Sequence, residues 1–230
     1  MKVLNNFPWT AIIPIRAGSI GLPDKNTKLL CDKPLYRYAV DLALEGGANQ
    51  VLITTDISEV INAKFDSRVR VIKRPHSLCE ANAQMAPVIS HAIESALVRG
   101  PLVLLQATSP LRNLMHLNAV LELYKRNIFD LIMTIAPATS EVLKWGTLED
   151  NRYLPISDPA YCFANRQNLP KLYRPNGAIY AMDSQWFLRN GGFVTENIGV
   201  IEMTVEDSVD IDTLLDFQAC ETVLNNRNEK

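Results

Sequence analysis

The sequence has few of the residues that mark metal-bound or disulfide-linked proteins. Its 230 residues include four cysteines and three histidines. No two cysteines form a CxxC pair and the histidines lack HExxH spacing, so we expect no zinc site. Cysteines this far apart predict small core residues in a reducing compartment and argue against a disulfide framework.

A strong excess of charge and long apolar runs are also missing. The formal net charge is −2, which disfavours DNA, RNA and anionic membranes as partners. No segment approaches the ~20 apolar residues of a membrane span. The N-terminal stretch MKVLNNFPWTAIIPI has no apolar run of secretory-signal length. We therefore expect a protein that works in the cytoplasm.

The chain does contain enough apolar residues, 47%, for a full core. Short apolar runs alternate with segments of helical periodicity. We expect strands at 10–15, 50–55, 68–72, 101–106, 130–135, 178–182 and 198–203. We expect helices from Leu35 to near Gly46 and Gly47, at 57–65, at 86–98, around 117–124 and from 213 onward. This alternation predicts one α/β domain with a doubly wound, mainly parallel sheet.

The rhythm breaks between about residues 137 and 176. This stretch is polar, rich in proline and without a clear period. A long irregular insertion in a compact domain is usually a functional loop, a disordered segment or an arm that packs on a partner subunit. The residues alone leave these three possibilities open.

The first predicted strand runs into the loop PIRAGSIGLPDKN, residues 14–26. In open parallel sheets, ligands bind beyond the carboxyl ends of the strands, where this loop must lie. Gly18 and Gly21 allow close backbone approach, Ser19 adds donors, and Arg16 and Lys25 add positive charge. The set suits a phosphate chain, although it matches neither the Walker loop nor the dinucleotide fingerprint.

Other polar side chains follow strands that end at the same edge. The segment 104–112, LLQATSPLR, brings Gln106 and Arg112 there, and TTD at 54–56 brings Asp56. In SVDIDT, residues 208–213, two carboxylates stand two residues apart, at Asp210 and Asp212. An extended segment puts both on one face, and carboxylates beside a triphosphate are usual magnesium ligands.

Each of these residues also has an ordinary structural explanation. Asp212 is well placed to cap the last helix. Arg166 and Arg174 fit surface charges on a loop, and Asn176 with Gly177 fits a turn before a strand. Gln106 fits a side chain that satisfies backbone groups at a strand end.

Taken together, the motifs resemble the acylneuraminate cytidylyltransferase family, the CMP-sialic acid synthetases. The matching stretches are IPIRAGSIGLPDKN, TTD, KRP at 73–75, LLQATSPLR, RQNLPKLYRPNGAIY at 166–180 and SVDIDTLLDF. Their order and spacing match from about residue 10 to residue 224. The resemblance implies a single nucleotidyltransferase domain over residues 1–230, in which residues 137–176 form a dimerisation arm.

The resemblance also implies an activity and a set of site residues. Family members couple CTP to a nine-carbon 2-keto sugar acid, a nonulosonic acid, and release pyrophosphate with the help of Mg²⁺. By similarity, CTP would contact Arg16, Gly18, Ser19, Lys25, Asn26, Arg74 and Gln106. The sugar acid would contact Gln106, Arg166, Arg174 and Asn176, with one arginine reaching across from a second subunit. Asp210 and Asp212 would hold magnesium, and with Arg16 and Lys25 they form the expected catalytic set.

The chain departs from the family pattern at three places. Ile20 replaces a loop lysine, and losing a preorganised donor to developing charge typically costs about 10²- to 10³-fold in rate. Gln84 and Met85 stand where small hydroxyl residues are usual, and Ala107 replaces a proline. Three possibilities follow: an active enzyme in which Lys25 or Arg16 covers the missing charge, an enzyme for a related acid such as the eight-carbon KDO, or an impaired homologue that acts by association.

Overall fold

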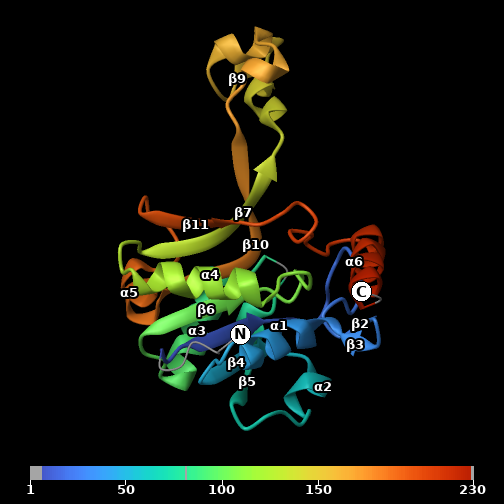
Figure 1. Ribbon diagram of the computed structural model, residues 1–230, viewed down its shortest axis with the longest axis vertical. Coiled ribbons are helices and arrows are strands. Elements are labelled where there is room, and N and C mark those ends of the chain that lie inside the picture. Colours follow the sequence, from blue (N-terminus) through green and yellow to red (C-terminus); the bar gives the residue numbers. More distant parts are fainter. Residues whose placement is uncertain (1–6, 81, 229–230) are drawn as a thin grey trace.

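The computed structural model describes residues 7–80 and 82–228; residues 1–6, where the sequence predicts no leader, lie outside the described part. A seven-stranded sheet forms the centre of the body (Figure 1). Its strands run in the order β11 (Ile198–Glu202), β7 (Leu131–Ala138), β10 (Leu172–Asp183), β6 (Pro101–Leu105), β1 (Thr10–Pro14), β4 (Gln50–Thr55) and β5 (Val69–Lys73).

The sheet is mainly parallel, as the alternation of strands and helices predicts. β6, β1, β4 and β5 pair in parallel, and so do β11 and β7. β10 is the exception, because it runs antiparallel to both β6 and β7. It is also longer than the predicted strand at 178–182, since it begins at Leu172.

Helices cover both faces of the sheet, which confirms the doubly wound prediction. Alternate residues of β1 face opposite sides: Ile13 packs with α1 (Leu35–Glu45) and α4 (Leu114–Lys125). Ile12 packs on the other side with α3 (Met85–Ala96) and α5 (Ser184–Asn190). Strands buried on both faces are continuous apolar runs, which is why the sequence identifies them well.

Several boundaries differ from the predictions. The helix expected at 57–65 is only α2 (Ser58–Ile61). Two short elements went unpredicted, the hairpin of β2 (Leu29–Leu30) and β3 (Lys33–Pro34) and helix α5. Of the four unpaired cysteines only Cys220 is buried, so the prediction of core positions is wrong for Cys31, Cys79 and Cys162.

The segment 137–176, called the arm below, projects from the body (Figure 1). It is not irregular throughout, because β8 (Gly146–Glu149) and β9 (Arg152–Pro155) form an antiparallel hairpin. Three short 3₁₀ helices complete it: η2 (Ser140–Lys144), η3 (Pro159–Phe163) and η4 (Arg166–Asn168). β7 and β10 continue into the arm as its paired stalk.

The last helix, α6 (Leu214–Asn228), packs beside the sheet and not on either face of it (Figure 1). Its Phe217 and Cys220 join a separate apolar cluster with Leu22, Leu111 and Ile211. Across the described ranges, no helix combines the length and the apolar character needed to cross a membrane.

Candidate functional site

A cleft of about 310 Å³ opens at the carboxyl ends of β5, β4, β1 and β6. Each of these strands delivers a polar residue to this edge as it ends: Arg74, Asp56, Arg16 and Gln106 respectively. The side chains that line the cleft include Arg16, Ser19, Ile20, Lys25, Asn26, Arg74, Gln106, Thr108 and Asp212. The structure thus brings most of the predicted CTP residues and one predicted magnesium ligand to one place.

The glycine loop, residues 15–28, is shaped by its own side chains. Asn26 is buried and its amide donates to the Arg16 carbonyl over 2.9 Å, which draws the two ends of the loop together. Asp56 accepts a hydrogen bond from the Ala17 backbone N–H at 2.8 Å. Gly18 has a φ of +66°, a conformation that favours glycine. The loop is therefore fixed in a curve around the cleft.

Arg16 folds back on this loop, where its guanidinium donates to the carbonyls of Ala17 and Gly18 at 3.2 and 3.0 Å. Ser19 is half-buried on the cleft wall. Both residues line the cleft, and their predicted contact with a triphosphate stays a prediction.

Lys25 joins the glycine loop to the carboxylate loop, residues 203–213. Its ammonium donates to the Ile211 carbonyl at 2.6 Å and to Asp212 Oδ1 at 2.8 Å. The side chain of Lys25 is only 12% exposed, so its charge is shielded from bulk water. Gly21 packs so closely that a Cβ there would lie 2.4 Å from the Asp212 carbonyl oxygen. The two loops are in direct contact across the cleft.

The carboxylates of this loop have different surroundings. Asp212 has a side chain that is 73% exposed and faces the cleft. Loss of hydration raises the pKa of Asp210, the nearby Asp212 charge raises it further, and the Thr108 side chain lowers it in part. Among the described residues no group of three or more His, Cys, Asp or Glu side chains gathers as a metal site. A pair of carboxylates still fits Mg²⁺, which commonly takes one or two of them plus substrate phosphates.

Helix α6 does not use Asp212 as its N-cap, so the alternative explanation of Asp212 as a capping residue is wrong. Thr213 and Asp216 cap it reciprocally: Asp216 accepts from the Thr213 N–H at 2.8 Å, and Thr213 Oγ1 accepts from the Asp216 N–H at 3.3 Å. The carboxylate of Asp212 is left to Lys25 and the cleft.

Arg74 is buried beneath the cleft floor. Its guanidinium donates to the carbonyls of Ile15 and Thr54 at 3.1 and 2.9 Å, and burial lowers the pKa of the side chain. It therefore ties together the ends of β1 and β4 and places a positive charge behind the site.

Gln106 lines the cleft at the end of β6. Its carbonyl accepts a hydrogen bond from Arg112, which also donates to the carbonyl of Ser109 at 2.9 Å. Arg112 is fully buried, and burial lowers its pKa to about 9. Arg112 therefore fixes the backbone of this loop and leaves the Gln106 side chain to face the cleft.

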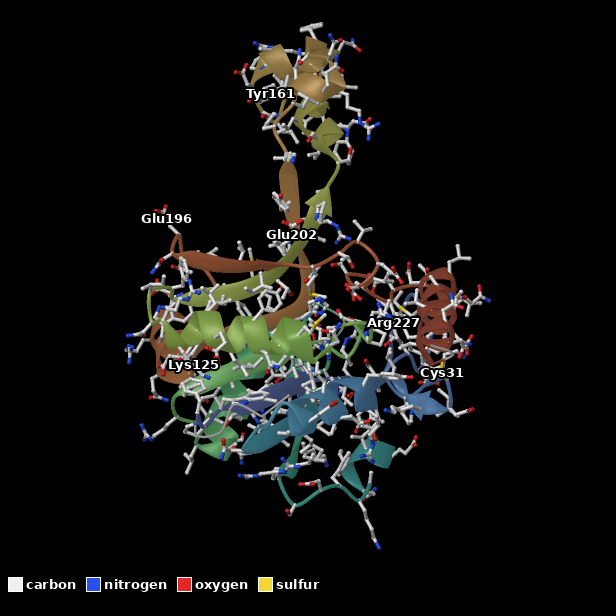
Figure 2. All side chains as sticks on the ribbon, viewed as in Figure 1. Cys31, Lys125, Tyr161, Glu196, Glu202 and Arg227 are labelled. Carbon is white, nitrogen blue, oxygen red and sulfur yellow. The ribbon has the colours of Figure 1, made fainter. Side chains whose placement is uncertain are left out.

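The predicted sugar-acid residues do not all meet at the cleft. Arg166 lies in η4 of the arm, 77% exposed, with Glu141 Oε1 at 3.7 Å. Arg174 is exposed on β10, close enough for its charge to act on Asp210. Asn176 is 2% exposed, inside a bulge of β10, and not on the cleft wall. Figure 2 shows the arm, with Tyr161 near its far end, well separated from the body.

Two of the three departures from the family pattern lie at the cleft, and the third lies in the core. Ile20 is 82% exposed at the cleft mouth, and Ala83 and Met85 line the cleft further along. Gln84 is exposed just before α3. Ala107 is buried in the core, where it replaces the family's proline without reaching the cleft.

Two functional features were not assigned from the sequence. The sequence predicted Asp56 at the correct edge of the sheet. Its hydrogen bond with the Ala17 N–H could not be predicted, because the two residues are brought together only by the fold. The shared apolar cluster of Leu22, Leu111 and Ile211 anchors the three cleft loops against α6. Single apolar residues in polar loops were the only signal for it.

Comparisons with known proteins bear on the family and the fold of the chain. A family model described as cytidylyltransferase matches residues 10–187. An N-acylneuraminate cytidylyltransferase of Streptococcus agalactiae serotype V is 31% identical over 90% of this chain, which spans about half (51%) of that relative's length. A CMP-N,N'-diacetyllegionaminic acid synthase of Legionella pneumophila is 24% identical over 95% of this chain and 97% of its own.

Among solved structures, a CMP:2-keto-3-deoxy-manno-octonic acid synthetase in complex with CTP superimposes with a TM-score of 0.71. The match covers 96% of this chain and 100% of that chain, at 14% identity, so it bears on the fold alone. Because the family model covers well over half of the residues, the chain belongs to the cytidylyltransferase family.

Proposed function

We propose that this protein is a cytidylyltransferase that couples CTP to a nonulosonic, sialic-acid-like 2-keto sugar acid and releases pyrophosphate. The observation that carries the proposal is the contact between the glycine loop and the carboxylate loop, made by Lys25 and Asp212 across the cleft. A triphosphate needs the cations of the first loop, and its magnesium ion needs the carboxylates of the second.

In this proposal the chain acts mainly by position and charge. Arg16, Lys25 and the N–H groups around Ser19 hold the triphosphate, while Arg74 adds positive charge from below the floor. The oxygen of the acid's anomeric hydroxyl bonds to the α-phosphorus and the hydroxyl proton passes to a carboxylate, Asp210 or Asp212. The bond from phosphorus to the bridging oxygen breaks, and pyrophosphate departs with its electron pair. Such in-line transfer depends on alignment and on neutralising oxygen charge, with no covalent enzyme intermediate.

Asp210 and Asp212 would hold Mg²⁺, which when bound neutralises phosphate charge next to the reacting centre. Asp212 is paired with Lys25 at 2.8 Å. Lys25 therefore balances the charge of this carboxylate, and both residues line the cleft where the triphosphate is proposed to bind.

The acid's carboxylate is assigned to Arg174 and Arg166, because a guanidinium matches a carboxylate with two parallel hydrogen bonds. Arg166 lies in the arm, so in this proposal it serves the cleft of a second copy. The arm carries exposed apolar side chains that suit such a homodimer: Trp145, Leu148, Tyr153, Ile156 and Phe163.

The protein is proposed to act in the cytoplasm, where CTP is available, with no nucleic-acid or membrane partner. Its formal net charge of −2 supports this part of the proposal.

The exposed Ile20 favours one alternative function, that of a homologue with impaired catalysis that acts as a binding partner. A cytidylyltransferase for another acid, such as the eight-carbon KDO, is the alternative within the same chemistry. One assay distinguishes both alternatives from the proposed function.

The assay incubates the purified protein with CTP, Mg²⁺ and, in turn, N-acetylneuraminic, legionaminic and KDO acids, and measures pyrophosphate release. Asp212→Asn is the test variant, and Asp24→Asn, an exposed carboxylate in the glycine loop outside the cleft lining, is the matched control. We expect release with a nine-carbon acid that Asp212→Asn abolishes and Asp24→Asn preserves.

Release with KDO alone would overturn the substrate class and keep the reaction. No release with any acid, together with no CTP binding, would overturn the proposal and favour the impaired homologue.

A further inference from the structure

Three buried polar side chains join the base of the arm to the carboxylate loop. Thr134 on β7, Asn176 on β10 and Ser208 on the carboxylate loop are 1%, 2% and 1% exposed. Thr134 Oγ1 donates to Asn176 Oδ1 at 2.6 Å, and Asn176 Nδ2 donates to Ser208 Oγ at 2.9 Å. The three side chains form a continuous chain of hydrogen bonds shielded from water.

These three hydrogen-bonded side chains meet at a bulge of β10. Pro175 pairs with Ile135 and Tyr180 with Met133, so residues 176–179 of β10 face the single residue Thr134. The Thr134 hydroxyl accepts the Ile179 N–H at 3.0 Å, and Asn176 Oδ1 accepts the Ala178 N–H at 3.1 Å. Gly177 has a φ of +77°, which such a bulge requires. The Asn-Gly pair therefore marks a bulge within a strand and not the turn before one.

The Asn176 amide has no spare hydrogen-bonding capacity for a substrate. Its oxygen accepts from Thr134 and Ala178, and its nitrogen donates to Ser208 and lies 3.2 Å from the Met203 sulfur. A buried amide that loses a hydrogen-bond partner costs free energy. We therefore expect Asn176 and its four partners, Thr134, Ala178, Ser208 and Met203, to keep their relative positions.

The bulge links two regions that act in the proposed reaction. On one side, β7 and β10 lead directly into the arm. On the other, Ser208 stands two residues before Asp210 and four before Asp212. The Ala178 carbonyl of the bulge also accepts from Arg112 at 3.4 Å, the side chain that holds the Gln106 backbone.

We propose that Asn176 is a positioning residue that couples the stalk of the arm to the carboxylate loop and so sets the placement of Asp210 and Asp212. The inference rests on the proposed function for the role of those carboxylates. It reassigns Asn176 from the sugar-acid contact predicted from sequence to a support behind the site.

The test removes one hydrogen bond of this series at Thr134, the member that does not touch the carboxylate loop. Thr134→Val removes the hydroxyl and keeps the shape, and Thr134→Ser restores the hydroxyl. Ser184→Ala is the matched control, because Ser184 is also fully buried, follows β10 directly, and donates its hydroxyl to the Val98 carbonyl at 3.3 Å, away from the carboxylate loop.

Two readouts are needed besides activity. Hydrogen exchange of residues 208–213, followed by mass spectrometry, reports the order of the loop without any substrate. Mn²⁺ binding in the presence of CTP, followed by electron paramagnetic resonance, reports the carboxylates. We expect Thr134→Val to speed exchange of this loop about tenfold and to weaken Mn²⁺ binding by a similar factor. Thr134→Ser should restore both the exchange rate and the Mn²⁺ affinity. Ser184→Ala should change neither quantity, even if it lowers the melting temperature as much as Thr134→Val does.

Unchanged exchange and metal binding in Thr134→Val would overturn the coupling. Equal effects in Thr134→Val and Ser184→Ala would also overturn it, because a general loss of stability would then suffice. If the wild type released no pyrophosphate but Thr134→Val still loosened residues 208–213, the coupling would stand and the proposed function would fail.

Discussion

The cleft and the arm use their side chains in opposite ways. In the cleft, charged groups are tied to nearby backbone: Lys25 to the Ile211 carbonyl, Arg74 to those of Ile15 and Thr54, and Asp56 to the Ala17 amide. In the arm, large apolar side chains lie open to water, with Phe163 91% and Leu148 76% exposed. The cleft is thus organised within one chain, whereas the arm has surface left to cover.

If the chain forms the proposed homodimer, this difference separates the function of a single copy from the function that requires two copies. Preorganised charges do not depend on a partner, so CTP binding is expected of a single chain. Exposed apolar clusters mark association sites, and Arg166 lies in the same arm. The four predictions below test this division, in order of expected effect.

The largest effect is expected at Lys25. Lys25→Ala removes a shielded cation that touches both loops of the cleft and should lower kcat/KM about 10³-fold. Steady-state pyrophosphate release measures it. Lys28→Ala, an exposed lysine of the same loop, serves as the control and should stay near wild type. Unchanged turnover in Lys25→Ala would refute its role, including the idea that it covers the charge missing at Ile20.

A charge in the arm should separate the copies without harming the nucleotide site. Phe163→Asp is expected to weaken dimerisation about 100-fold, while CTP affinity stays the same, because Phe163 lies far out on the arm. Analytical ultracentrifugation and calorimetry measure the two quantities. Val194→Asp, equally exposed on the body, is the control. If both variants dimerise as the wild type does, the arm is not the contact surface.

Restoring the family's lysine sharpens the account of the cleft. Ile20 is 82% exposed, so a lysine there would act through solvent, and Ile20→Lys should tighten CTP binding only about fivefold. The gain should shrink as salt is added. Leu29→Lys adds the same charge on the exposed hairpin and should give no gain. A 100-fold gain in rate from Ile20→Lys would instead indicate an impaired native site.

The smallest effect concerns the anchoring of the carboxylate loop outside the cleft. His116 Nδ1 accepts from the Asn113 N–H at 3.2 Å, and its Nε2 lies 3.7 Å from Asp207. Burial lowers the pKa of His116, so as pH falls below the ordinary histidine value the unfolded chain takes up the proton more readily and stability is lost.

His116→Gln keeps a capping residue at this position and removes the titration. Between pH 7 and pH 5 we expect the wild type to lose more unfolding free energy than this variant, because only the wild type carries the histidine whose pKa is lowered by burial. Urea unfolding at both pH values measures it. Equal pH dependence in the two proteins would mean that His116 does not titrate against folding.

Much of the cleft could be predicted because its residues follow apolar strands that are easy to identify. β1, β4 and β6 are continuous buried runs, and in a parallel sheet their ends must meet. That logic predicts Arg16, Lys25 and Gln106 at one edge, and the structure brings them together. Asp212, predicted from its spacing to Asp210 and from the family resemblance, lines the same cleft.

The arm and the bulge could not be predicted in the same way. Stability in the arm comes from a short hairpin and 3₁₀ turns, which leave no long periodic pattern. Asn176 resembles a turn residue in sequence, and only the register of β10 against Thr134 shows that its amide is fully engaged. Long-range pairing of this kind has no local signal.

The most direct test of the central claim is a crystal structure of the protein with CTP and Mg²⁺. The account predicts the triphosphate between Arg16 and Lys25, with the metal ion at Asp210 and Asp212. Nucleotide bound elsewhere would contradict it, for example in a separate hollow of the surface that is lined by Lys33, Asp41 and Asn113.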